Sequence, residues 1–219
     1  MEIIGIDPRG RDVPRRALRI LRAGGLVAFP TDTYYALGAA ALDPTAIARV
    51  FAAKRRPAAD PLPLLVADRD QWRSAVTEIP AAALRLADRF WPGPLTIVCR
   101  RASDLPAALG GGGDTVGVRQ PALPIAAALC QELGMPVVGT SANTHGMPAP
   151  ATAAQVALDL GESVDLILDG GRSPGTRPST VVDVTRTPPV VVRVGAVPMD
   201  AVRAVIGDAS VASEAVALR

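Results

Sequence analysis

Short apolar runs rich in Val, Ile and Leu alternate along this chain with longer segments in which apolar residues recur at helical spacing. The short runs predict buried strands, and the longer segments predict helices. Strands that alternate with helices are typical of an α/β domain, in which helices cover a sheet. The predicted strands are residues 26–29, 62–66, 95–99, 115–119, 137–140, 164–168, 180–184 and 190–194. The predicted helices are residues 12–23, 45–54, 79–90, 123–133, 153–160 and 199–206.

Capping residues mark the ends of the first two helices. Asp12 is the expected N-cap of the first helix, and Gly24 ends it. Asp43 followed by Pro44 is a typical start for the second helix. This start places Lys54 at the C-terminal end of the second helix.

The length and composition fit one domain with a substantial core. The chain has 219 residues, of which 49% are hydrophobic but only 3% aromatic, so the core is built mainly from Ala, Val, Leu and Ile. The sequence contains no clear linker or internal repeat. We expect residues 1–207 to form a single domain and residues 208–219 to form a loose C-terminal tail.

The sequence gives no sign of a secretory or membrane protein. The N-terminus lacks the basic and then apolar pattern of a signal peptide. Apolar stretches all fall short of the roughly 20 residues that cross a membrane. We therefore expect a cytoplasmic protein with no membrane partner. A formal net charge of +2 is too small to indicate nucleic-acid binding by itself.

Neither metal nor thiol chemistry is indicated. Cys99 and Cys130 lie among apolar residues, so we expect buried free thiols rather than a disulfide or a nucleophile. His145 is the only histidine, which leaves too few ligands for a zinc cluster, and we predict no metal-ligating residues. We expect His145 at a surface loop tip rather than in the role of a catalytic base.

Lys54 stands out because it is the only lysine among 23 lysines and arginines. A compact ammonium group is not equivalent to the planar guanidinium of arginine. Arg55, Arg56 and Pro57 follow it directly. Such a cluster can simply complement the dipole at a helix C-terminus. It can also hold cations in place to stabilise charge on a transferring phosphoryl group.

Four loops rich in small and hydroxylic residues follow predicted strands. In α/β sheets, ligands bind outside strand ends, where loops offer backbone N–H groups and hydroxyls. One such loop is an ordinary cap, but several in one domain favour an anion-binding site. The phosphate-binding motifs of P-loop and Rossmann proteins are both missing from the sequence. The loops are residues 30–33, 139–143, 169–171 and 178–180.

Eight blocks follow one another along the chain: PTDTYYALG, KRRPAADPL, WPGPLT, TVGVRQP, GTSANTHG, DGG, PSTVVD and VVRVG. Taken in order, these blocks resemble the YrdC/TsaC family of L-threonylcarbamoyladenylate synthases. The resemblance runs from about Gly24 to Gly195, and the ordered set is far more specific than any single block. It implies a single-domain α/β fold with a twisted mixed sheet flanked by helices and a large concave basic cavity.

The resemblance also implies a nucleotidyltransferase reaction. L-threonine, bicarbonate and ATP, the last with Mg²⁺, would become threonylcarbamoyl-AMP and pyrophosphate. This is the first step toward threonylcarbamoyladenosine in tRNA, and a downstream transferase complex would move the group onto tRNA. Any direct contact between this chain and tRNA is expected to be weak. No tightly bound organic cofactor is implied.

The site residues that the resemblance implies fall into three groups. The catalytic tetrad is Lys54, Arg56, Ser141 and Asn143. The residues expected to hold threonine are Thr33, Arg119 and Ser179. The residues expected on the nucleotide side are Arg56, Asp60, Thr115, Ser141 and Arg193.

The chain departs from the family pattern in places. Ala36 replaces the usual glycine of the first block and would restrict that turn if a positive φ were needed there. The chain ends soon after VVRVG, so we expect the short bacterial form. Three alternatives remain open: a YciO-like paralogue, a module that binds double-stranded RNA or tRNA, and an ATP-using enzyme with a different amine substrate. The intact tetrad favours the synthase over the YciO-like paralogue.

Overall fold

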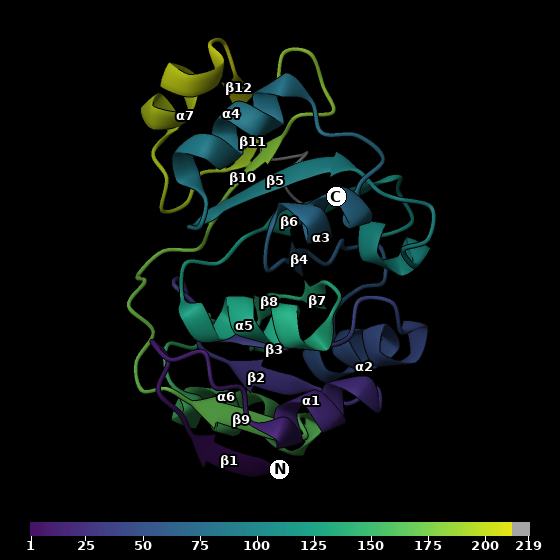
Figure 1. The fold of residues 1–219 in the computed structure, drawn as a ribbon, viewed down its shortest axis with the longest axis vertical. Helices are drawn as coiled ribbons and strands as arrows, with labels where there is room; N and C mark the ends of the chain where they lie inside the picture. The colour runs from purple at the N-terminus through teal and green to yellow at the C-terminus, as the bar shows by residue number, and fades with distance from the viewer. Residues whose placement is uncertain (212–219) are drawn as a thin grey trace.

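The computed structural model describes residues 1–211 and shows an α/β fold of two mixed sheets flanked by helices (Figure 1). The α/β class is confirmed, but the strands divide between two sheets instead of forming one. The first sheet has the strand order β1 (Glu2–Gly5), β9 (Leu166–Asp169), β2 (Val27–Phe29), β3 (Ala36–Gly38) and β8 (Thr140–Ser141). The second has the order β12 (Ser210–Val211), β11 (Val190–Arg193), β10 (Thr180–Asp183), β5 (Leu95–Arg100), β6 (Thr115–Arg119), β4 (Leu64–Leu65) and β7 (Val137–Val138).

The chain steps from one sheet to the other at Gly139. Strand β7 belongs to the second sheet and β8 to the first, and Gly139 alone separates them. A Cβ at this position would lie 2.3 Å from Leu65 Cγ, so the close approach of β4 requires glycine here. The predicted strand 137–140 is therefore two short strands in different sheets.

Helices flank both sheets (Figure 1). Helices α1, α2 and α6 lie around the first sheet, while α4 and α7 pack together beside the second (Figure 1). Helix α5 contacts both α1 and β4. The α-helices are α1 (Arg15–Arg22), α2 (Pro44–Lys54), α3 (Arg69–Ala75), α4 (Ala81–Phe90), α5 (Pro124–Leu133), α6 (Ala153–Leu160) and α7 (Met199–Ile206). Short 3₁₀ helices occur at η1 (Ala107–Gly110) and η2 (Gly161–Ser163).

Most predicted helices are confirmed, with one wrong start. The second helix begins as predicted, because the Asp43 side chain accepts hydrogen bonds from the N–H groups of Thr45 and Ala46. The first helix begins at Arg15 instead, and its N-cap is Pro14 rather than Asp12. Asp12 is exposed and lies outside the helix, because Pro14 fixes the backbone just before the first turn.

Several elements gave no sequence signal strong enough to predict them. Helix α3 is short and mostly polar, and its only large buried side chain is Trp72. Strands β1, β3, β8 and β12 are too short for a clear alternating pattern. Strand β12 pairs with β11 inside the segment expected to be a tail, and residues 212–219 lie outside the described part of the chain. Within residues 1–211, no helix has the length and apolar character needed to cross a membrane.

A buried threonine ties the second sheet to the loop after β11. Thr180 is 0% exposed, and its hydroxyl donates to the Val197 carbonyl oxygen at 2.6 Å. The same oxygen accepts hydrogen bonds from the N–H groups of Gly195 at 2.8 Å and Val197 at 3.1 Å. One hydroxyl therefore satisfies three buried backbone groups of a loop that has no regular pairing of its own.

Replacing Thr180 by valine is expected to destabilise the fold by about 3 kcal/mol, because the shape is kept while three buried polar groups lose their partner. Urea unfolding followed by circular dichroism measures the change. Thr77→Val is the matched control, since Thr77 is exposed and should shift the free energy of unfolding by less than about 0.5 kcal/mol. Equal stability of the two variants would show that the Thr180 hydroxyl does not hold this loop.

Candidate functional site

A cavity of about 540 Å³ lies between the two sheets. Its walls come from the loop after β2, from the strands of the second sheet and from the segment around β8 where the chain changes sheets. The charged residues in the lining are Arg56, Arg119 and Arg193. Most of the predicted site residues line the cavity: Thr33, Arg56, Thr115, Arg119, Ser141, Asn143, Ser179 and Arg193. Lys54 and Asp60 do not belong to the lining.

Lys54 lies directly beneath the Ser141–Asn143 segment. It is the last residue of α2 and is only 1% exposed. Its Nζ donates to the carbonyl oxygens of Ser141 at 2.6 Å and Asn143 at 2.7 Å, and to Asn143 Oδ1 at 3.4 Å. Burial, and then the charge of Arg56, lower the pKa of Lys54 to about 8. In this arrangement the ammonium holds the loop that presents Ser141 and Asn143 to the cavity.

Arg56 reaches the cavity from the turn that follows α2. Its Nη2 donates to the Pro61 carbonyl oxygen at 3.1 Å, and its Nε lies 3.8 Å from Asp60 Oδ2. On its other side Asp60 faces His145, whose Nε2 is 3.7 Å from the same carboxylate oxygen. Asp60 therefore contacts Arg56 outside the cavity, where it can orient the guanidinium. His145 is exposed, as predicted.

Arg119 and Thr33 form a polar group at one end of the cavity. Arg119 ends β6 and is only 5% exposed, and its Nη1 donates to Thr33 Oγ1 at 3.1 Å. Its Nη2 lies 3.7 Å from Asp32 Oδ1, and Thr33 Oγ1 lies 3.0 Å from Thr31 Oγ1. Burial lowers the pKa of the Arg119 guanidinium, while the Asp32 charge opposes that shift. This end presents a forked cation beside two hydroxyls.

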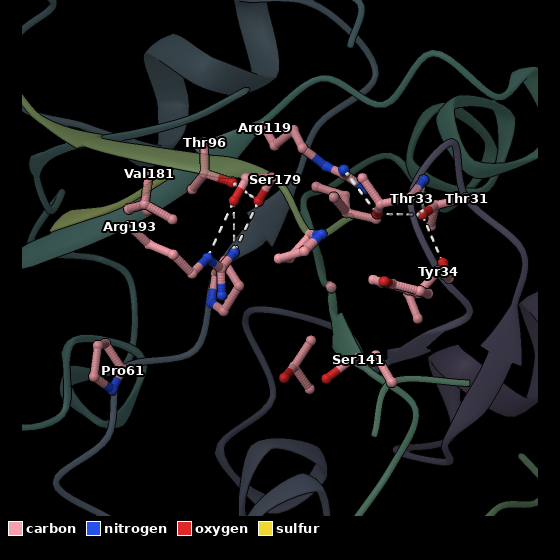
Figure 2. Close-up of a pocket in the computed structure, with 18 of the residues that line it drawn as sticks. Thr31, Thr33, Tyr34, Pro61, Thr96, Arg119, Ser141, Ser179, Val181 and Arg193 are labelled. Atoms are coloured by element: carbon pink, nitrogen blue, oxygen red, sulfur yellow. Dashed lines mark hydrogen bonds between the residues drawn. The ribbon is translucent and has the colours of Figure 1, made fainter. Parts of the chain in front are cut away.

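Arg193 and Ser179 form a second polar group on the opposite side (Figure 2). Arg193 Nη2 donates to the Ser179 carbonyl oxygen at 2.9 Å and to Ser179 Oγ at 3.1 Å. Ser179 Oγ also lies 2.8 Å from Thr96 Oγ1. Burial, and then the charges of Arg119 and Arg56, lower the pKa of Arg193. The three guanidinium groups thus repel one another in the cavity, and a bound anion would relieve that repulsion.

Ala36 fits the site without backbone strain. In the described part of the chain, Arg55 is the only non-glycine residue with a positive φ, so the turn at Ala36 does not need glycine. Ala36 pairs with Phe29 on one side and with Ser141 on the other as part of β3.

Thr31, Thr96 and Tyr34 also line the cavity, although the sequence did not single them out. Thr31 lies in the hydroxyl-rich loop 30–33, so that loop was the available signal. Tyr34 and Thr96 lie within the blocks PTDTYYALG and WPGPLT, so those blocks were the available signal for them.

Both cysteines lie in the core, as the sequence predicts. Cys99 and Cys130 are both buried and free. Burial raises the pKa of each thiol to about 12, which keeps both protonated and unreactive near neutral pH. Over residues 1–211, no group of three or more His, Cys, Asp or Glu side chains is arranged to hold a metal ion.

The chain matches a known family model over most of its length. The model is the Sua5/YciO/YrdC family, described as "Telomere recombination", and it matches residues 19–195. A curated threonylcarbamoyl-AMP synthase of Pyrococcus abyssi is 45% identical over 194 residues, covering 89% of this chain and 57% of that protein. A putative threonylcarbamoyl-AMP synthase of Mycobacterium tuberculosis strain H37Rv is 38% identical over 191 residues, covering 87% of this chain and 88% of that protein.

Solved structures show the same likeness. The structure of P. abyssi Sua5 complexed with L-threonine matches with a TM-score of 0.92 and 41% identity, covering 97% of this chain and 63% of that one. E. coli YciO matches with a TM-score of 0.78 and 31% identity, covering 89% of this chain and 95% of that one. The chain spans less than two thirds of the length of the P. abyssi protein.

The low pKa of Lys54 predicts a pH-dependent stability. Its pKa falls from 10.5 in the unfolded chain to about 8 in the folded one, so the folded state carries a charging cost below pH 8. That cost disappears as the pH rises from 8 to 10.5. Relative to Lys54→Met, the wild-type protein should gain about 2 kcal/mol of stability between pH 7.5 and pH 10. Urea unfolding of both proteins at the two pH values measures this gain, and an unchanged difference would contradict it.

Proposed function

Because the chain belongs to the Sua5/YciO/YrdC family, we propose that it is an L-threonylcarbamoyl-AMP synthase. In this reaction L-threonine, bicarbonate and ATP give threonylcarbamoyl-AMP and pyrophosphate. The observation that carries the proposal is the cavity between the sheets, where three arginines and several hydroxyls converge. A cavity of this kind suits a substrate pair in which both reacting groups are anionic.

The chemistry requires two anions to approach each other. The threonine amine first captures bicarbonate to give a carbamate, with loss of water. A carbamate oxygen then attacks the α-phosphorus of ATP, the bond from that phosphorus to the β-phosphate oxygen breaks, and pyrophosphate leaves. Arg56, Arg119 and Arg193 offset the repulsion between carbamate and phosphate, because fixed cations in a partly buried cavity stabilise developing negative charge.

The amino acid fits the end of the cavity at Arg119. Its guanidinium would form a forked pair with the threonine carboxylate, and Thr33 would accept or donate a hydrogen bond beside it. Ser179 lines the same cavity from the second sheet and is already held by Arg193 and Thr96. These contacts support threonine binding between the two polar groups.

The nucleotide fits the side of the cavity formed by Arg56, Thr115 and Arg193, with Ser141 at the strand end. Lys54 would act mainly through the Ser141–Asn143 segment, since its Nζ bonds all go to oxygens of that segment. Asp60 would act through Arg56 rather than by touching ATP, because it lies outside the cavity lining.

Mg²⁺ would enter with ATP. Phosphate oxygens are its preferred ligands, and the ion commonly keeps several waters when it binds a nucleotide. The lining residues fit this arrangement, because they offer Thr and Ser hydroxyls and cations but no carboxylate that would compete for the metal. When bound, Mg²⁺ would neutralise part of the triphosphate charge.

The proposal also covers the partners of the protein and its location in the cell. The product would pass to a transferase complex that modifies tRNA, and any tRNA contact with this chain would be weak. Because tRNA is modified where it is used, we propose that the protein acts in the cytoplasm. The likeness of the P. abyssi and M. tuberculosis relatives, which are named as synthases, supports this reading.

Pyrophosphate release from ATP is expected to require both L-threonine and bicarbonate. A coupled pyrophosphate assay with each substrate omitted in turn measures this requirement, and mass spectrometry should detect threonylcarbamoyl-AMP. The variant Arg119→Lys tests the site, and Arg203→Lys is its matched control because Arg203 is exposed on α7. ATP-independent RNA binding without pyrophosphate release would favour the RNA-binding alternative. Folded protein with neither property would favour a YciO-like role.

Arg119→Lys is expected to raise the threonine KM by about 10- to 100-fold, because lysine keeps the charge but loses the forked hydrogen bonds. The ATP KM should change by less than about threefold, and Arg203→Lys should match wild type in both. Steady-state pyrophosphate release at varied threonine and at varied ATP measures the two constants. Equal increases in both KM values would contradict the assignment of Arg119 to threonine binding.

A further inference from the structure

The segment between β9 and β10 carries the chain from the first sheet to the second along one edge of the molecule (Figure 1). This crossover, residues 170–179, has no regular secondary structure. Its last two residues, Pro178 and Ser179, line the cavity. A segment of this kind has no ladder of its own to fix it, so side chains from elsewhere must decide where it lies.

Two consecutive tyrosines bind the crossover. The hydroxyl of Tyr35 donates to the Gly171 carbonyl oxygen at 2.7 Å and accepts a hydrogen bond from the Gly170 N–H at 3.2 Å. The hydroxyl of Tyr34 donates to the Thr176 carbonyl oxygen at 2.7 Å. Tyr35 is fully buried and fixes the start of the crossover, while Tyr34 is half-buried and fixes its middle.

The crossover packs directly against the backbone of the loop after β2 that contains Thr33. A Cβ on Gly175 would lie 2.5 Å from the Asp32 carbonyl oxygen and 2.5 Å from Thr33 Cα, so no side chain fits between the two segments. The Tyr34 hydrogen bond at Thr176 is the next contact along the chain. Three residues later, Ser179 is held from the opposite side by Arg193 and Thr96.

Tyr34 also forms part of the cavity wall. Its side chain lies on the Thr33 side of the cavity (Figure 2). The crossover is thus held at Thr176 by Tyr34 and, three residues later, at Ser179 by Arg193 and Thr96. Loss of the Thr176 contact would free the part of the crossover that packs against Thr33.

We infer that Tyr34 is a positioning residue that determines specificity. Its hydrogen bond holds the crossover against the loop that contains Thr33, and the two segments together enclose the side chain of the amino-acid substrate. This inference rests on the proposed synthase function. Threonine and serine differ by one methyl group, and a pocket favours threonine only where protein atoms surround that methyl and exclude water. The Tyr34 hydrogen bond keeps that wall closed.

The test compares Tyr34→Phe with Thr176→Ala. The phenylalanine keeps the ring and removes only the hydroxyl, whereas the alanine removes the Thr176 side chain and keeps the carbonyl oxygen that accepts the bond. Tyr34→Phe should raise the threonine KM by about three- to tenfold, the scale of one lost hydrogen bond, with kcat within about twofold of wild type. It should lower the preference for threonine over serine in kcat/KM by about threefold or more. Thr176→Ala should match wild type in every constant.

Hydrogen exchange tests, independently of the reaction, whether the Tyr34 hydrogen bond fixes the crossover. In Tyr34→Phe, the Ser173 N–H, which donates to the Ala151 carbonyl oxygen at 2.9 Å, should exchange about three to ten times faster, while the amides of β5 and β6 should keep their wild-type rates. Calorimetry with L-threonine and with L-serine gives the amino-acid preference without turnover. Unchanged exchange at Ser173 would overturn the role of the Tyr34 hydrogen bond in fixing the crossover. Faster exchange with an unchanged threonine-to-serine ratio would overturn the specificity role.

Failure of the proposed function gives a different pattern. Wild-type protein that neither binds threonine nor releases pyrophosphate would overturn the synthase assignment, and the specificity role with it, whatever the exchange rates. Wild-type protein that is active, with Thr176→Ala as impaired as Tyr34→Phe, would show that the side chain of Thr176 and not the Tyr34 bond fixes the crossover. That outcome would also overturn the inference.

Discussion

The buried ammonium of Lys54 is the interaction on which the geometry of the site depends. It joins the end of helix α2 to the carbonyl oxygens of Ser141, the last residue of β8, and of Asn143, just after that strand. A buried charge is costly unless it is fully hydrogen-bonded, so these oxygens cannot move away without leaving the ammonium unpaired. This segment lies just after Gly139, where the chain passes from the second sheet to the first. One hydrogen-bonded charge therefore fixes a helix end, a sheet junction and the two polar residues that face the cavity.

The cavity brings together three guanidinium groups whose mutual repulsion a bound anion would relieve. Arg119 has a partial counter-ion in Asp32, and Arg56 has one in Asp60. Arg193 instead bonds to neutral oxygens of Ser179, and burial, followed by the charges of the other two guanidinium groups, lowers its pKa. The protein holds these cations together through folding, so the arrangement is ready before an anion arrives. Preorganised charge of this kind is what a reaction between a carbamate and a phosphate requires.

Loops rather than regular elements complete the site. The loop after β2 supplies Thr33, the turn after α2 supplies Arg56, and the crossover between the sheets ends at Ser179. Arg119 fixes the first loop and Tyr34 fixes the third, both from distant parts of the chain, while the second is held by its own Asp60. The two sheets thus act as a rigid frame, and a small number of hydrogen bonds set the loops that meet between them.

The sequence by itself determined the α/β class, most helices and many of the residues that meet in the cavity, because periodic apolar patterns and an ordered set of motifs are local properties of the chain. It also placed Lys54 at a helix end, through the Asp43–Pro44 start. Only the tertiary structure decided that the strands form two sheets, since Gly139 separates two strands that the sequence pattern predicts as a single strand. It alone placed Lys54 beneath the loop and Tyr34 against Thr176, because these contacts join residues far apart in sequence and leave no local pattern.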